Sequence, residues 1–214
     1  MRDPYLSHRL HKVSNVTGPT TPLRFGVVDL ETTGLRIDRH RILQLGLVIV
    51  EHGRVIDQWT TYVKLRRPWQ RLGPRHVHGI RRRDLRGAPR LVDALDELAD
   101  RLDGAIFTAH NAAFDGGFLE TAARAEGSRL RIGPRLCTLR LSRRLDPDRL
   151  LSHRLGDLCD RYGLTIERPH DALSDALATA EVLPRLLDAH GITCAEQLAP
   201  FYDRTDAPAP SPRR

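Results

Sequence analysis

Apolar residues recur along the chain at two spacings, and the spacing typical of strands comes first. Continuous apolar runs rich in β-branched residues at positions 23–30, 42–50 and 55–63 predict three buried strands. The turn sequence EHGR separates the second run from the third, which indicates a hairpin. A shorter apolar run at 105–109 predicts a fourth strand.

The spacing typical of helices dominates the rest of the chain. Leucines repeat every three or four residues across 91–102, and a second helix is predicted from about 115 to 126, where a glycine stops it. A third apolar stripe covers 173–187, in which Pro184 is expected to kink or restart the helix. The segment 135–163 predicts short helices joined by Arg-rich connections. Three strands followed by alternating helix and strand predict an α/β domain built on a mixed sheet.

The two ends of the chain differ from this middle. Residues 1–22 are basic and show no periodicity, which predicts a poorly ordered segment. Residues 201–214 are rich in Pro and Arg, which predicts a disordered tail. One domain over 23–200 is the simplest organisation, because no internal repeat and no long linker divides it.

Composition narrows the class of protein. The chain has 214 residues, of which 40% are hydrophobic and 29% charged, which is enough for a core without disulfides. Its longest apolar run, 45–50, is far shorter than the roughly 20 residues that cross a bilayer, so no membrane partner is expected. Residues 1–15 lack the apolar stretch of a secretion signal. Three cysteines without a CxxC pair favour a reduced, cytoplasmic protein.

Charge is distributed in blocks of alternating sign. The net charge is +7, and Lys and Arg counted against Asp and Glu give +8 for 65–90, −6 for 91–128, +6 for 129–154 and −4 for 155–189. Basic blocks on a folded domain favour a polyanion such as nucleic acid. A charge run alone is also typical of a solvated face, so chemistry has to come from specific residues.

Two carboxylates end the first predicted strand, in the sequence VVDLETTGL. Because strand side chains alternate, Asp29 and Glu31 point to the same face about 7 Å apart. Carboxylates in this arrangement repel each other unless a divalent cation such as Mg²⁺ or Mn²⁺ compensates them. The alternative is that both turn out to solvent where the strand ends.

Further acidic residues lie in two other motifs. In the sequence HNAAFD, Asp115 follows a strand and opens a helix, where it either joins the acidic site or acts as the helix N-cap. In the sequence PHDALSD, His170 precedes the third helix and can fold back toward Asp175. A neutral imidazole near a metal-bound water suits a general base, whereas a lone His beside Pro is more often a surface residue. Asp171 and Asp175 form a rival metal pair, which would leave the other acids without a role.

Taken together, the motifs Asp-x-Glu, HNAxFDxxFL and His-x4-Asp resemble the DEDDh exonucleases, the DnaQ-like family of polymerase proofreading subunits. The resemblance runs from about residue 24 to residue 187 and includes the sequence VHGI at 77–80. It implies an RNase H-like fold with a central mixed five-stranded sheet flanked by helices. It also implies hydrolysis of a phosphodiester at the 3′ end of a strand with two divalent metal ions, Mg²⁺ or Mn²⁺, releasing 5′-mononucleotides.

The resemblance further implies a role for each matching residue. Asp29, Glu31 and Asp175 would hold the metal nearer the nucleophile. Asp29 would bridge to the second metal, which Asp115 would help to hold, and His170 would accept the proton of the attacking water. The residues expected to touch the terminal nucleotide, with local packing as their alternative role, are Thr32, Leu35 and Phe114, with Asn111 and His78 as further candidates.

Several alternatives stay open at this point. The substrate is DNA or short RNA, and the sequence ETTG leans toward the DNA-proofreading branch with a single-stranded 3′ end as partner. A non-catalytic nucleic-acid-binding module of the same fold is a rival, although no ligand is missing. An Asp-x-Asp phosphatase is another, although it would need Asp in place of Glu31.

Partner proteins are expected only on separate chains, as a polymerase or a sliding clamp. The sequence QLAPF at 197–201 faintly resembles clamp-docking peptides and suits a buried helix equally well. The basic blocks at 65–90 and 129–154 fall between the acidic motifs and would hold the strand that enters the site without reading its sequence.

Overall fold

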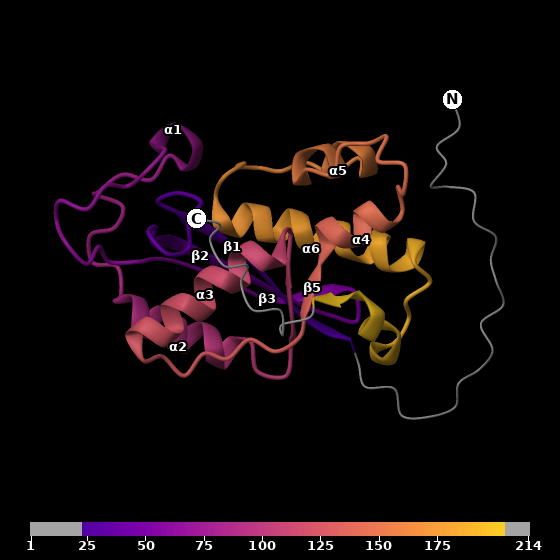
Figure 1. Ribbon diagram of the computed structural model, residues 1–214, viewed down its shortest axis with the longest axis horizontal. Helices are drawn as coiled ribbons and strands as arrows, with labels where there is room; N and C mark the ends of the chain where they lie inside the picture. The colour runs from indigo at the N-terminus through magenta and orange to yellow at the C-terminus, as the bar shows by residue number, and fades with distance from the viewer. Residues whose placement is uncertain (1–22, 204–214) are drawn as a thin grey trace, which may run out of the picture.

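The first three strands pair in chain order as an antiparallel sheet. They are β1 (Arg24–Thr32), β2 (Ile42–Glu51) and β3 (Arg54–Tyr62) in the computed structural model, which describes residues 23–203 (Figure 1). Their bounds agree closely with the apolar runs of the sequence, because long buried strands produce a clear pattern.

The rest of the sheet extends from the other side of β1. β4 (Ile106–Ala109) lies parallel to β1, β5 (Arg135–Cys137) lies parallel to β4, and β6 (Tyr202–Asp203) pairs antiparallel with β5. The strand order is β3-β2-β1-β4-β5-β6, so the prediction of an α/β domain on a mixed sheet is confirmed. The sheet has six strands rather than the five expected, because the two residues of β6 add one at the edge.

Helices cover both faces of this sheet (Figure 1). The helices in the described part of the chain are α1 (Arg75–His78), α2 (Leu91–Arg101), α3 (Ala112–Glu126), α4 (Thr138–Arg144), α5 (Leu155–Tyr162) and α6 (Ala172–Ala189), followed by the 3₁₀ helix η2 (Ala195–Phe201). Of the kink or restart expected at Pro184, the restart does not occur, because α6 continues through this residue; Leu183 and Leu186 on either side of it are fully buried. Within residues 23–203, none of the helices combines the length and apolarity needed to cross a bilayer.

The ordered chain continues beyond the sequence-based boundary at residue 200. Phe201 ends η2, and Tyr202 and Asp203 form β6, so residues 201–203 are part of the folded domain, which differs from the expectation for them. β6 depends on the exposed edge of β5, a tertiary contact that the local sequence does not reveal. The expectations for residues 1–22 and 204–214 lie outside the described residues.

Alternate residues of β1 face two different hydrophobic clusters. Val28 packs in the cluster that includes α2 and α3, whereas Val27 packs in the cluster that includes α4, α5 and α6. Asp29 and Glu31 follow Val27 by two and four residues, so their side chains point to the same face of the sheet, which α6 covers. The sheet therefore presents both carboxylates to one helix.

A glycine in β2 lets α6 approach the sheet at this point. Gly46 pairs with Asp29 across the two strands, so a side chain at position 46 would share the face of Asp29. A Cβ atom added to Gly46 would lie 2.2 Å from the carbonyl oxygen of Ala172, the first residue of α6. The missing side chain allows the start of α6 to rest directly on the strands that carry the carboxylates.

Gly46→Ala is expected to lower the free energy of unfolding by about 1–3 kcal/mol, because the added methyl meets backbone atoms and the start of α6 must shift. Thermal or denaturant unfolding measures this loss. Gly156→Ala is the matched control, since an added Cβ on this glycine of α5 meets nothing within 4 Å. Equal stability of Gly46→Ala and the unchanged protein would show that α6 does not rest on Gly46.

Candidate active site

Three elements bring four carboxylates to the carboxyl end of β1. Asp29 and Glu31 lie on β1, Asp115 lies in the first turn of α3, and Asp175 lies in the first turn of α6. Glu31 and Asp115 expose only 9% and 3% of their surface. Because a helix N-terminus carries partial positive charge, both first-turn positions favour a carboxylate.

The acidic groups lie close enough to act on one another. Side-chain oxygen or nitrogen atoms of Glu31, His170 and Asp175 lie within 4.8 Å of one another. The charges of Asp115, Asp175 and Glu31 each raise the pKa of Asp29. The structure therefore gathers at one place all five residues that the sequence predicts as metal ligands or general base.

Burial and repulsion raise the pKa values of this acidic cluster. The pKa of Asp29 stands well above its ordinary range, first because of burial and then because of Asp115 and Asp175. Burial, followed by the charges of Asp175 and Asp171, raises the pKa of Glu31 to about 8. Burial also raises the pKa of Asp115 to about 8, against backbone hydrogen bonds that lower it. Such acids retain protons near neutral pH unless positive charge compensates them.

His170 lies in the connection before α6, as the sequence predicts. Its φ is 63°, in the left-handed region that few non-glycine residues adopt. Its backbone N–H donates to Oδ2 of Asp175 over 3.1 Å, which ties this conformation to the start of the helix. His170 is exposed while the acids beside it are wholly or partly buried.

Asp171 is the N-cap of α6, a role that sequence reasoning missed. Its Oδ1 accepts from the backbone N–H of Ser174 at 3.2 Å, and its Oδ2 accepts from Nε2 of Gln44 at 3.0 Å. Because both carboxylate oxygens are engaged in these bonds, the structure disfavours the rival metal pair of Asp171 and Asp175.

Gln44 is a second residue that sequence reasoning missed. It lies in β2 opposite Glu31 and exposes only 3% of its surface. Its amide donates to Asp171, and its Oε1 accepts from the backbone N–H of Ala172 at 3.5 Å, so it fastens the start of α6 to the sheet. The sequence does carry a sign of its role, because Gln44 is the one side-chain amide in the apolar run ILQLGLVIV.

A buried polar network holds the start of α3. Nε2 of His110 donates to the carbonyl oxygen of His153 at 3.0 Å, and its Nδ1 lies 3.0 Å from Oγ1 of Thr138. The ring of His153 lies 2.8 Å from Oγ of Ser142 and 3.1 Å from Oδ2 of Asp146. Burial lowers the pKa of His110 to about 4, so its imidazole is neutral. The network joins the residues before α3 to α4 and the loop after it.

The residues expected to touch a nucleotide occupy different settings. Leu35 is 81% exposed just beyond β1. Phe114 is half-buried, with its ring centroid 4.9 Å from that of Phe118. Thr32 is buried, and its hydroxyl donates to the carbonyl oxygen of Gly34 at 2.7 Å, so it shapes the turn after β1.

Asn111 and His78 take part in the local backbone structure. Asn111 is the exposed N-cap of α3 with φ 73°, so the alternative of Asp115 as that cap is wrong. His78 is buried in α1, where its Nδ1 accepts from the backbone N–H of Ile80 at 3.0 Å and its Nε2 lies 3.0 Å from the carbonyl oxygen of Leu72. Both ring nitrogens of His78 are therefore used within its own segment.

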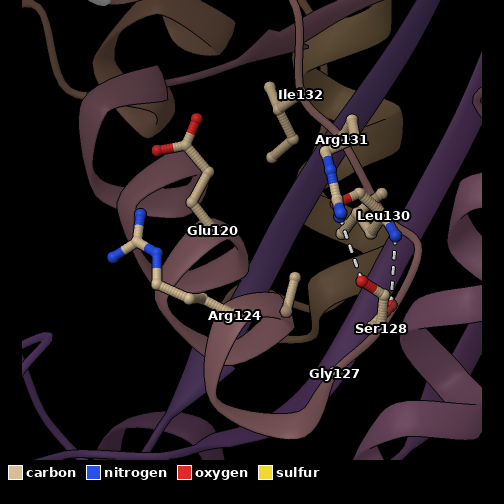
Figure 2. Close-up of a pocket in the computed structure, with 8 residues that line it drawn as sticks. Glu120, Arg124, Gly127, Ser128, Leu130, Arg131 and Ile132 are labelled. Carbon is tan, nitrogen blue, oxygen red and sulfur yellow. Dashed lines mark hydrogen bonds between the residues drawn. The ribbon is translucent and has the colours of Figure 1, made fainter.

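A pocket of about 470 Å³ lies at the far end of α3, and it is distinct from the acidic cluster (Figure 2). Glu120 and Arg124 of α3 face Arg131 and Ile132 across it. A guanidinium nitrogen of Arg131 donates to the backbone carbonyl oxygen of Ser128 at 3.0 Å. None of the sequence-predicted site residues lines this pocket.

The strand order and the position of the acids at the end of the first strand define a class of protein, the nucleases of RNase H-like fold. A family profile described as Exonuclease matches residues 27–183, a range that includes all four acids and His170. The chain belongs to this family, as a DnaQ-like DEDDh 3′–5′ exonuclease.

Individual relatives agree with this assignment. The chain is 34% identical over 169 residues to the DNA polymerase III PolC-type of Halalkalibacterium halodurans, which matches 79% of this chain but only 12% of that polymerase. Exonuclease X, solved in complex with 5′ overhanging duplex DNA, is 26% identical with a TM-score of 0.63, over 84% of this chain and 98% of that chain. The nuclease domain of 3′hExo bound to rAMP has a TM-score of 0.68 at 15% identity, over 85% and 96% of the two chains, which shows the fold alone.

Family membership decides between the rival classes of protein. The chain is an exonuclease that acts on nucleic acid, so the Asp-x-Asp phosphatase interpretation of DLETT is wrong, and the non-catalytic module is not favoured. Divalent metal ions are the normal cofactors of this family.

Raising the pH is expected to destabilise the protein in EDTA. The folded chain holds the proton of Glu31 more tightly than the unfolded chain does, so this contribution to stability is complete below the unfolded pKa of 4.5 and is lost as pH rises through the folded pKa of about 8. The melting temperature in EDTA should therefore fall from about pH 5 to about pH 8, and Mn²⁺ should restore it most at the upper end.

Glu31→Gln should weaken this pH dependence, since the amide has no proton to lose, while the raised pKa values of Asp29 and Asp115 maintain part of it. Glu126→Gln, at an exposed glutamate that ends α3, is the control and should keep the profile of the unchanged protein. A melting temperature in EDTA that does not depend on pH would contradict the burial of the acidic cluster.

Proposed function

We propose that this exonuclease removes nucleotides from the 3′ end of DNA with two divalent metal ions and releases 5′-mononucleotides. The observation that carries the proposal is the convergence of four acids and His170 at the end of β1. A DNA substrate is supported by 34% identity to a DNA polymerase and by 26% identity to an exonuclease solved with DNA. RNA is the alternative substrate, which the assay below tests directly.

The residues present fit divalent cations. Carboxylate oxygens are the ligands that Mg²⁺ and Mn²⁺ prefer, and the charges of its neighbours raise the pKa of Asp29, an effect that bound cations would reverse. Asp29, Glu31 and Asp175 would hold one ion, and Asp29 with Asp115 would hold the other. When bound, such ions screen the phosphate from the acids, activate a water and stabilise the departing 3′ oxygen.

His170 would accept the proton of the attacking water. Its imidazole lies close to Glu31 and Asp175, and its exposed position leaves room for a water molecule. Because Asp175 accepts a hydrogen bond from the backbone of His170, the base and one acid keep a constant relation to each other. A neutral imidazole offers an unprotonated ring nitrogen that can accept a proton, which suits this role.

The terminal nucleotide would meet apolar side chains beside the acids. Leu35 presents an exposed side chain four residues after Glu31, and Phe114 precedes Asp115 in α3. Thr32 and Asn111 would shape the two backbone segments that carry these contacts. The bonds of His78 to its own segment favour a positioning role for it rather than contact with the nucleotide.

A polymerase is the protein partner that the polymerase relative favours, since the matching region is 12% of that polymerase. Clamp docking through QLAPF finds no such support, because this sequence forms η2, where Leu198 is fully buried and Phe201 packs against His190 with ring centroids 4.8 Å apart.

All three cysteines are free, which supports the reduced, cytoplasmic setting expected from the sequence.

An assay with 3′-labelled oligonucleotides tests the activity. Single-stranded DNA, mismatched duplex and short RNA are incubated with Mg²⁺, Mn²⁺ or EDTA, and mononucleotide release is expected from DNA with either metal and from nothing in EDTA. Asp29→Asn should lose at least about a thousandfold in rate and His170→Ala about a hundredfold or more. Asp103→Asn, at the opposite end of the sheet just before β4, should keep full rate.

Two results would contradict the proposal in different ways. Release from RNA and not from DNA would leave the exonuclease site intact but overturn the DNA substrate. Full activity of Asp29→Asn would show that the acids at the end of β1 do not carry the reaction.

Leu35→Ala is expected to raise KM for single-stranded DNA roughly tenfold with little change in kcat, because it removes an apolar contact to the terminal nucleotide made in ground state and transition state alike. Steady-state kinetics measures the split. Leu150→Ala is the matched control, since both leucines are 81% exposed. Identical KM values for the two variants would remove Leu35 from the binding site.

A further inference from the structure

The segment between β3 and α2 concentrates the positive charge of the molecule. Residues 64–90 contain ten of the 34 basic residues of the sequence and one acid, Asp84. Figure 1 shows α1 and the chain on either side of it projecting at the end of the molecule where α6 begins. The acidic cluster lies at this same end, since Asp175 is in the first turn of α6.

This basic segment is built into the fold. Leu72, Ile80 and Leu85 are buried against Leu43 of β2 in a small hydrophobic cluster of their own. The backbone N–H of Lys64 donates to the carbonyl oxygen of Pro89 at 2.8 Å, which closes the base of the segment. The two ring bonds of His78 brace its middle. The arginines are therefore displayed on a preformed surface.

Five arginines surround one cavity in this segment. The cavity has a volume of about 710 Å³ and is lined by Arg71, Arg75, Arg81, Arg82 and Arg83, and no acidic side chain lines it. Arg82 donates to the carbonyl oxygens of Pro68 and Gln70, and Arg83 lies 3.7 Å from Asp84. Arg71, Arg75 and Arg81 have no side-chain hydrogen bond or ion pair with any described residue. Three exposed cations without a counter-charge among residues 23–203 form a site for anions.

The cavity adjoins the end of β1 that carries the acids. Gly73 lines the cavity, and a Cβ atom added to it would lie 2.1 Å from the carbonyl oxygen of Thr33. Thr33 follows Glu31 by two residues. A chain of nucleotides that enters the acidic site can therefore continue along the arginines.

An exposed aromatic side chain lies in the same segment. Trp69 exposes 73% of its surface and lies between Pro68 and Gln70, the two residues whose carbonyl oxygens Arg82 holds. An indole ring displayed among arginines is typical of surfaces that stack unpaired bases while cations hold the backbone.

We propose that residues 64–90 form a second binding surface, which holds the single-stranded nucleic acid behind the 3′ end. Arg71, Arg75 and Arg81 bind its phosphates, and Trp69 stacks on one of its bases. This assignment rests on the proposed function, because the proposed cleavage at the 3′ end determines which part of the strand lies on the arginines. The presence of the surface can be tested without any catalysis.

A binding experiment in EDTA tests the phosphate contacts. Fluorescence anisotropy measures the affinity for a labelled single-stranded DNA of about 20 nucleotides at several salt concentrations. Replacing Arg71, Arg75 and Arg81 together by Gln should weaken binding at least tenfold. It should also reduce the slope of log K, the association constant, against log salt concentration by about 2, because each phosphate contact contributes roughly 0.7 to this slope. The matched control replaces Arg54, Arg124 and Arg185 by Gln, which removes the same charge from positions distant along their elements from the acids. It should retain most of the affinity and the slope.

A catalytic comparison shows whether the surface serves the exonuclease site. With Mn²⁺, kcat/KM is measured for this oligonucleotide and for a short substrate, a p-nitrophenyl ester of thymidine 5′-monophosphate. The quantity compared is the ratio of the first value to the second. The triple variant at Arg71, Arg75 and Arg81 should lower this ratio at least tenfold, because only the long substrate reaches the arginines. The control triple should keep the ratio.

Tryptophan fluorescence tests the stacking contact. The chain has two tryptophans, and Trp59 is packed under Arg101, whose guanidinium lies 5.5 Å from its ring centroid. Single-stranded DNA should therefore quench the emission of Trp59→Phe, in which Trp69 remains, and should leave that of Trp69→Phe nearly unchanged. Equal quenching in both variants would overturn the role of Trp69.

The outcomes separate this proposal from the proposed function. If the arginine triple variant matches its control in affinity, salt slope and rate ratio while melting at the same temperature, the surface does not bind nucleic acid. In another outcome, the unchanged protein binds the DNA but cleaves neither substrate, and the triple variant loses this binding. The proposed function then fails and the binding surface stands.

Discussion

Repulsion among four carboxylates is the constraint on which the rest of the structure depends. The acids are buried or half-buried at the end of β1, where water screens them poorly, and their pKa values rise accordingly. Only rigid surroundings can hold like charges together, and β1 provides them because helices cover both of its faces. The first turns of α3 and α6 add partial positive charge beside Asp115 and Asp175. A bound cation would therefore stabilise the charged forms of these acids.

Much of this arrangement follows from local sequence rules. The apolar run before Asp29 predicts a buried strand, and the alternation of strand side chains is enough to place Asp29 and Glu31 on one face. The sequence alone does not decide whether Asp115 caps α3 or lies within it, since Asp is a common N-cap. The helix begins three residues earlier than its apolar pattern suggests. The left-handed conformation of Asn111 starts that helix, and backbone conformations of this kind leave little trace in the sequence.

Contacts between distant segments were beyond sequence reasoning. Gln44 and Asp171 are separated by 127 residues, and His110 meets the backbone of His153 across 43 residues. Each of these side chains also suits a solvent-exposed position, so only the tertiary structure reveals that it is bonded and at least partly buried. The short strands β5 and β6 are of the same kind, because they exist only where a neighbouring edge completes their hydrogen bonds.

The close approach of α6 to Gly46 has a consequence for how the site loses its shape. Backbone rests on backbone there, so the spacing between helix and strand cannot be adjusted by a change of rotamer. Asp175, the Asp171 cap and the loop that carries His170 all belong to this one rigid end of α6. Heating or mutation that lifts the helix must therefore separate the base and an acid from β1 in a single step, so the centre fails cooperatively and does not loosen by degrees.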